Sequence, residues 1–70
     1  MRIYLVSEEA YHESSIIHGA YSSVEKAMES HPTNWMPARY PADSNWHNVV
    51  MVALEWNGAT LVMREIEVDK

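Results

Sequence analysis

The fold depends on one stretch of the chain, Trp46-His-Asn-Val-Val-Met-Val-Ala-Leu-Glu-Trp56, then Asn57-Gly58, then Ala59-Thr-Leu-Val-Met-Arg-Glu-Ile-Glu-Val68. Two β-rich runs flank an Asn-Gly pair, which is the strongest short-range signal for a hairpin. Both residues of the pair tolerate the positive φ that a type I′ turn requires at its two central positions. Residues 46–56 and 59–68 are therefore predicted to form one long antiparallel hairpin that turns at Asn57-Gly58.

Two more strands are predicted in the first third of the chain. The run at 2–6 is β-branched and aromatic, and both of its alternating sets are apolar, which is typical of a central strand. A second run covers 15–21. Gly19 lies inside this second run and predicts a bulge or a close approach of another group to the backbone.

A short helix is predicted directly after the second strand. Ser22 and Glu25 have the spacing of a capping box, in which the serine caps the helix and the glutamate reaches back to it. Apolar and half-polar residues then recur on one helical face, at Val24, Ala27, Met28 and His31. Pro32 ends the helix because the residue before a proline is pushed out of helical geometry. A helix this short is unstable alone and must lie on the sheet.

The connection at 31–45 shows neither a helical nor an alternating pattern, and it holds all three prolines. Its aromatic residues argue against disorder. An ordered loop that folds back on the domain is expected. The predicted fold is thus a single α+β domain over residues 1–70, in the order β-β-α-loop-β-β, with a four-stranded, antiparallel-rich sheet and one short helix packed on one face.

Composition narrows the classes of protein that fit. The 70 residues include no cysteine, so a disulfide-stabilised secreted domain is excluded. The longest apolar run, 49–54, is too short to span a membrane, and the N-terminal run lacks the features of a signal peptide, so a cytoplasmic protein is predicted. Ten acidic and five basic residues give a formal charge of -5, which argues against binding nucleic acid through phosphate contacts.

One motif joins the second strand to the helix, Ile17-x-Gly19-x-Tyr21-Ser22-Ser23-x-Glu25-x-Ala27, after an N-terminal Ile-Tyr-Leu-Val strand. This motif resembles a signature in a group of small, largely uncharacterised bacteriophage and bacterial α+β proteins. The resemblance covers about residues 1–30 and includes neither the proline-rich loop nor the hairpin. It implies the same fold class, carries over no catalytic residue, and favours a phage-type accessory protein.

The two faces of the hairpin carry the main functional clue. With a two-residue turn, Leu54 opposes Leu61 and Val52 opposes Met63, and both faces are then largely apolar. A single short helix can cover only one of them. Either a bulge changes the register or the 31–45 loop covers the second face, or an apolar patch remains and is buried against another chain.

No residue pattern predicts a catalytic, cofactor or metal site. The four histidines, His12, His18, His31 and His47, have neither the helical i, i+4 spacing nor the cysteine partners of a zinc site. Glu8, Glu9 and Glu13 are expected to form a solvated face. Glu65, Glu67 and Asp69 alternate along the last strand, where they are expected to protect a sheet edge by charge; the other interpretation is an acidic stripe that faces a basic partner or imitates phosphates.

The function predicted from these features is that of a non-enzymatic, acidic binding protein. It would act by protein–protein interaction, as a phage-type inhibitor or modulator of a larger host protein. The alternative is a structural accessory protein that closes its sheet face against itself in a homodimer. The residues expected to contact the partner are the aromatic residues of the loop and hairpin, Trp35, Tyr40, Trp46 and Trp56.

Overall fold

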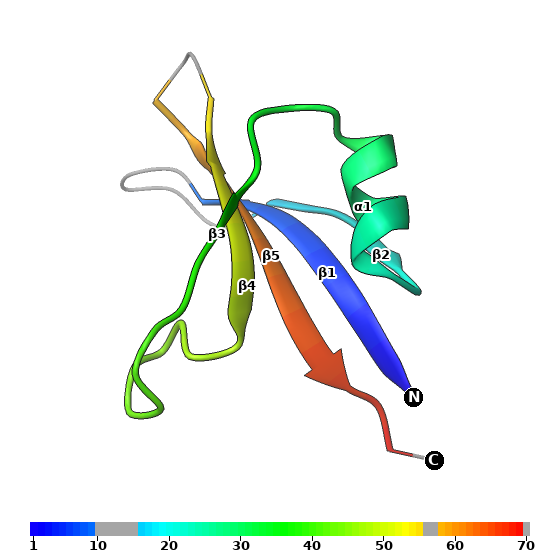
Figure 1. Cartoon of the computed structure of the whole chain (residues 1–70), viewed down its shortest axis with the longest axis vertical. Coiled ribbons are helices and arrows are strands. Elements are labelled where there is room, and N and C mark those ends of the chain that lie inside the picture. The colour runs from blue at the N-terminus through cyan, green and yellow to red at the C-terminus, as the bar shows by residue number, and fades with distance from the viewer. Residues whose placement is uncertain (10–15, 56–57, 70) are drawn as a thin grey trace.

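The computed structural model of the chain describes residues 1–9, 16–55 and 58–69. Its elements are β1 (Arg2–Glu9), β2 (Ile16–Tyr21), α1 (Val24–Ser30), β3 (Met36–Pro37), β4 (Val49–Leu54) and β5 (Thr60–Glu67). The strands form one antiparallel sheet in the order β2-β1-β5-β4-β3 (Figure 1). The long N-terminal strand therefore lies beside the last strand, as expected for a central strand.

The prediction of an α+β domain with four strands is wrong. The chain is mostly sheet, with about 49% of the described residues in five strands and about 11% in one helix. The additional strand is β3, which forms inside the segment predicted as a loop, where Met36 pairs with Val52 and Pro37 with Met51. Such a short edge strand has no pattern of its own to detect, because pairing with β4 defines it, and proline is tolerated at a sheet edge.

The pairing of β1 with β2 contains the irregularity predicted near Gly19. Val6 pairs with Gly19 and Ser7 with Ile17, so His18 is an extra residue on β2. A close approach to Gly19 is also present, because a Cβ atom at this position would lie 2.8 Å from the hydroxyl oxygen of Tyr21. Both predictions for the glycine are confirmed.

The helix forms where predicted but with a different cap. Its N-cap is Ser23, whose Oγ accepts a hydrogen bond from the backbone N–H of Lys26 at 3.2 Å. The predicted capping box between Ser22 and Glu25 is wrong by one residue. The helix ends at Ser30, just before Pro32 as expected. None of the helices in 1–9, 16–55 and 58–69 is long and apolar enough to cross a membrane.

The hairpin turn also differs from the prediction. The N–H of Glu55 donates to the carbonyl of Ala59 at 2.9 Å, and the N–H of Gly58 donates to the carbonyl of Glu55 at 3.1 Å. Three residues therefore separate the paired ends of the strands, one more than a two-residue type I′ turn allows. Gly58 has the positive φ expected of it, at 89°. Asn57 lies outside the described residues.

The longer turn changes the register of the hairpin by one residue. Ala53 pairs with Leu61 and Val52 with Val62, whereas the prediction paired Leu54 with Leu61 and Val52 with Met63. Because side chains alternate between the faces of a strand, a shift of one residue exchanges the two faces of β4. A further irregularity between Val49 and Met51 confirms the bulge that was one of the alternatives for this strand.

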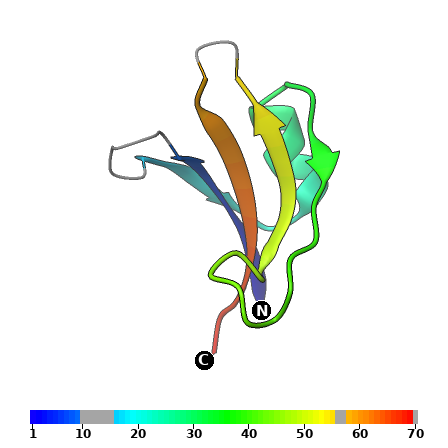
Figure 2. The same ribbon diagram turned by 90° about the vertical axis from the view of Figure 1, so that its left-hand side faces the viewer.

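The helix covers one face of the sheet, which we call the helix face. It packs on β1 and β2, and in Figure 2 it lies behind β4. The buried residues of this side come from four elements that are far apart in the sequence: Val6, Ala27, Ala53, Leu61 and Met63. Partly buried residues that include Tyr21, Val24 and Trp35 pack around them.

No helix of the described residues lies on the opposite face, which we call the open face. The register places Ile17, Ser7, Val62, Val52 and Met36 in one row across all five strands on this face. The centre of the row is buried, since Val62 is 0% exposed, whereas Ile17 is 66% and Met36 50% exposed at its two ends. Leu54, on the same face, is 70% exposed. The open face is therefore covered only in part.

Candidate functional site

The loop between β3 and β4 folds into a compact series of turns that brings two of the predicted partner-binding residues together. Ser44 organises these turns, because its N–H donates to the carbonyl of Pro41 at 3.0 Å and its Oγ accepts from the N–H of Trp46 at 3.1 Å. The ring of Trp46 then meets that of Tyr40 edge to face, with centroids 5.6 Å apart and planes at 70°. Aromatic pairs favour this geometry.

Trp46 also covers the polar centre of the open face. The guanidinium carbon of Arg64 lies 5.6 Å from the centroid of the Trp46 ring, within the range of a cation–π contact. The same guanidinium donates to the Oε1 of Glu9 at 3.2 Å and to the Oγ of buried Ser7 at 3.4 Å. Trp46 is thus half-buried, whereas Tyr40 lies at the outer side of the pair and is 38% exposed.

A surface pocket opens beside Tyr40, where β4 begins. It has a volume of about 440 Å³ and is lined by Pro37, Ala38, Arg39, Tyr40, His47, Val49 and Val50. This volume falls within the range of ordinary ligand sites. The Nδ1 of His47 lies 2.9 Å from the carbonyl oxygen of Ser44, so that Nδ1 carries the hydrogen and Nε2 is left for another partner. The pocket combines an apolar wall with two nitrogen-bearing side chains.

Trp35, another of the predicted residues, is not part of this site. Trp35 packs against the helix-face core, and its Nε1 donates to the carbonyl oxygen of His31 at 2.8 Å. Trp56 lies outside the described residues. Trp46 was predicted to begin the first strand of the hairpin, but it precedes β4 and belongs to the turns before it. Of the three predicted residues that the structure describes, Tyr40 and Trp46 lie together.

Sequence reasoning missed Arg39 and His47 as residues of the site. It considered the histidines only as metal ligands, and Arg39 has no motif around it. The available signal was weak: Arg39 lies in the proline-rich connection, whereas His47 lies at the start of the run that was predicted as a strand. Only the turn at Ser44 brings them to one pocket.

Two other histidines form a polar cluster on the helix face. The Nε2 of His18 lies 3.1 Å from the Oε1 of Glu8, and the Nε2 of His31 lies 2.9 Å from the hydroxyl oxygen of Tyr21. The two imidazole rings meet edge to face at 5.4 Å. No set of three histidine or carboxylate side chains in the described part of the chain suits a metal ion. The cluster ties the end of α1 to β2.

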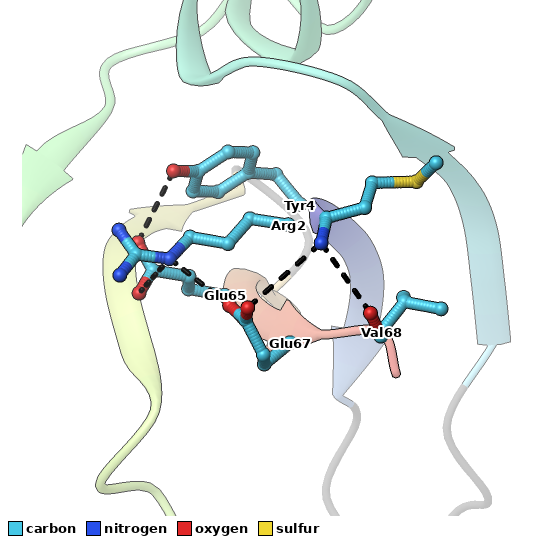
Figure 3. Close-up of polar contacts among 6 residues, drawn as sticks. Arg2, Tyr4, Glu65, Glu67 and Val68 are labelled. Atoms are coloured by element: carbon cyan, nitrogen blue, oxygen red, sulfur yellow. Dashed lines mark hydrogen bonds and ion pairs between the residues drawn. The ribbon is translucent and has the colours of Figure 1, made fainter. Parts of the chain in front are cut away.

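The carboxylates of the last strand do not protect a sheet edge, and that prediction is wrong because β5 lies between β1 and β4. Glu65 and Glu67 contact the neighbouring strand instead (Figure 3). The Nε of Arg2 donates to the Oε2 of Glu67 at 3.1 Å, and the hydroxyl of Tyr4 donates to the Oε2 of Glu65 at 3.1 Å. The hydrogen bond to Glu65 raises the pKa of the Tyr4 hydroxyl above its usual value, because it stabilises the protonated form.

Comparison with known proteins gives no relative: no family model matches the sequence, and neither a curated protein nor a solved structure matches it significantly. The resemblance of residues 1–30 to small bacteriophage and bacterial proteins stays a prediction.

Proposed function

We propose that this protein is a non-enzymatic binding protein that acts by contact with a larger protein, as an inhibitor or modulator. The observation that carries the proposal is the Tyr40–Trp46 pair beside a pocket of about 440 Å³. Tyrosine and tryptophan are enriched at the energetic centres of protein interfaces, because they bury a large area at a small cost in conformational entropy. Trp46 is held in place by Arg64 and the turn at Ser44, so the site is ordered before any partner binds.

Exposed apolar residues of the open face give additional support. Single exposed apolar residues are common on protein surfaces and need no explanation. Here, however, Met36 and Leu54 lie on neighbouring strands and on the same face, at 50% and 70% exposure. A partner that contacts this face would cover both side chains.

A photo-crosslinking experiment tests the proposal. p-Benzoylphenylalanine in place of Tyr40 is expected to crosslink a distinct, larger protein in the native host. The adduct should disappear when the same protein also carries Trp46→Ala. A matched control places the crosslinker at Glu29, which is exposed on α1. Equal crosslinking from positions 40 and 29, or none from position 40, would contradict a binding site at Tyr40.

A second candidate function is self-association, in which the protein is a structural subunit of a homodimer. The observation in its favour is the outer strand β2, where Ile16 is 53% and Ile17 66% exposed and no lysine, proline or carboxylate interrupts the strand. Natural sheet edges are usually protected by such residues. Size-exclusion chromatography with light scattering at low micromolar concentration separates the two candidates. A stable dimer that Ile17→Lys dissociates would favour self-association, whereas a monomer favours a foreign partner.

A further inference from the structure

The basic residues of this acidic chain differ in what they contact. Arg2 is bonded to Glu67, and Arg64 is bonded to Glu9. The side chains of Arg39 and Lys26, by contrast, make no ion pair or hydrogen bond within residues 1–9, 16–55 and 58–69. Of these two residues, Arg39 lines the pocket. In a chain with a formal charge of -5, an arginine without a carboxylate partner beside a pocket marks a position where an external anion can bind.

The rest of the pocket limits what that anion can be. Four of its seven lining residues are apolar: Pro37, Ala38, Val49 and Val50. A phosphate group carries close to two negative charges and needs several donors. Arg39 supplies one full charge, and His47 adds one ring nitrogen that is not bonded to the turn. This set matches the single charge of a carboxylate that is attached to an apolar group.

We propose that the pocket binds an acidic side chain of the partner protein that is flanked by an apolar residue in an extended segment. The carboxylate would accept hydrogen bonds from the guanidinium of Arg39, with His47 as the second donor when it is protonated. The apolar neighbour would pack on Val49 and Val50. This inference rests on the proposed function, since it names the chemistry by which the Tyr40–Trp46 site recognises its partner.

Arg39 is exposed, so an ion pair between its guanidinium and the carboxylate contributes only modestly to affinity. Exposed ion pairs change an equilibrium by up to about fivefold. The apolar contact contributes the remainder of the binding. A short peptide is therefore expected to bind weakly, and a matched uncharged peptide more weakly still.

The test is a titration of the isotope-labelled protein, followed by NMR, with the blocked peptide acetyl-Gly-Glu-Leu-Gly-amide. The largest changes in the amide chemical shifts of the protein are expected at the pocket, at Arg39, Tyr40, His47, Val49 and Val50. The peptide with Gln in place of Glu should bind about fivefold more weakly. The variant Arg39→Gln should lose this preference for Glu. The control variant Lys26→Gln removes a basic residue of α1 outside the pocket and should retain the preference.

Several outcomes would overturn the inference. Equal binding of the Glu and Gln peptides would remove the role of the carboxylate, and an unchanged preference in Arg39→Gln would remove the role of that residue. Tighter binding of acetyl-Gly-Gln-Leu with a free C-terminus would assign the pocket to a chain end instead of a side chain. Displacement of the peptide by equimolar inorganic phosphate would assign it to a general anion site.

The two proposals can fail separately. If the crosslink from position 40 forms but the peptides show no preference for Glu, the protein is a binding protein and only the ligand chemistry is wrong. If no specific crosslink forms, the proposed function is wrong even where the isolated pocket binds the peptide. Each outcome therefore assigns the failure to one proposal.

Discussion

The two faces of one sheet differ in how they are covered. On the helix face, residues from separate elements meet in a closed apolar cluster, and Val6, Ala27 and Met63 are each 0% exposed. On the open face, a charged residue, Arg64, lies near the centre and is covered by Trp46 from a loop. The helix thus closes one face into an apolar core, while the other face keeps polar contacts and exposed apolar side chains.

Burying the polar groups of the open face costs little folding free energy, because these groups are hydrogen-bonded to one another. Arg64 donates to both Ser7 and Glu9, and Ser7 is 3% exposed. Among the described residues, no buried side-chain nitrogen or oxygen is left without a hydrogen-bond partner. Buried polar groups are tolerated when they are bonded in this way. The open face is therefore an ordered surface whose buried polar groups are hydrogen-bonded.

The largest effect is expected from truncating matched methionines on the two faces. Met63→Ala, on the helix face, should cost about 2–5 kcal/mol of unfolding free energy, because it leaves a cavity in a closed cluster. The total unfolding free energy of a domain of this size is only about 3–5 kcal/mol, so a large part of the variant protein should be unfolded. Met36→Ala, on the open face, should stay within about 0.5 kcal/mol. Urea denaturation followed by circular dichroism measures both; equal losses would refute the distinction between the faces.

A smaller contrast is expected between two aromatic residues on either side of β3, Trp35 and Tyr40. Trp35→Ala should cost about 2–3 kcal/mol of stability, because the ring is half-buried and its Nε1 bonds to His31. Tyr40→Ala should cost about 1 kcal/mol, the value of one aromatic contact. Chemical denaturation of each variant gives the two values. If Tyr40→Ala is the more damaging of the two, Tyr40 is structural and its assignment to the binding site fails.

A third effect is expected at the turn that fixes which residues of β4 lie on which face. Gly58→Val should cost about 1–3 kcal/mol, because Gly58 has a φ of 89° that a β-branched residue rarely adopts. A Cβ atom there would meet nothing within 4 Å, so the cost comes from the backbone alone. Gly58→Asn is the matched control and should lose less, since asparagine tolerates this conformation. Equal melting temperatures for Gly58→Val and the parent protein would contradict the turn.

Local signals in the sequence predicted local features. The strand that begins at Arg2, the irregularity beside Gly19, the helix end before Pro32 and the positive φ of Gly58 each depend on one residue type in its immediate surroundings. Such features are readable because the energy that favours them lies within a few residues of the chain. The helix cap was predicted within one residue for the same reason.

The features that were predicted wrongly depend on pairing between distant segments. Met36 and Pro37 form a strand only because β4 lies beside them, and the carboxylate of Glu65 faces Tyr4 only because β5 is internal to the sheet. Contacts between distant segments also place Trp35 on the helix face and Trp46 on the open face. The alternation of apolar and polar residues within a strand does not indicate which other strand it will pair with.

The sequence by itself determined that the chain forms an antiparallel hairpin with two apolar faces, and that one short helix can cover only one of them. Only the tertiary structure decided which residues lie on each face. One additional residue in the turn moved Met51 and Ala53, instead of Val52 and Leu54, next to Leu61 and Met63. The physical reason is the two-residue period of a strand, in which a change of register by one residue exchanges the buried and exposed sets.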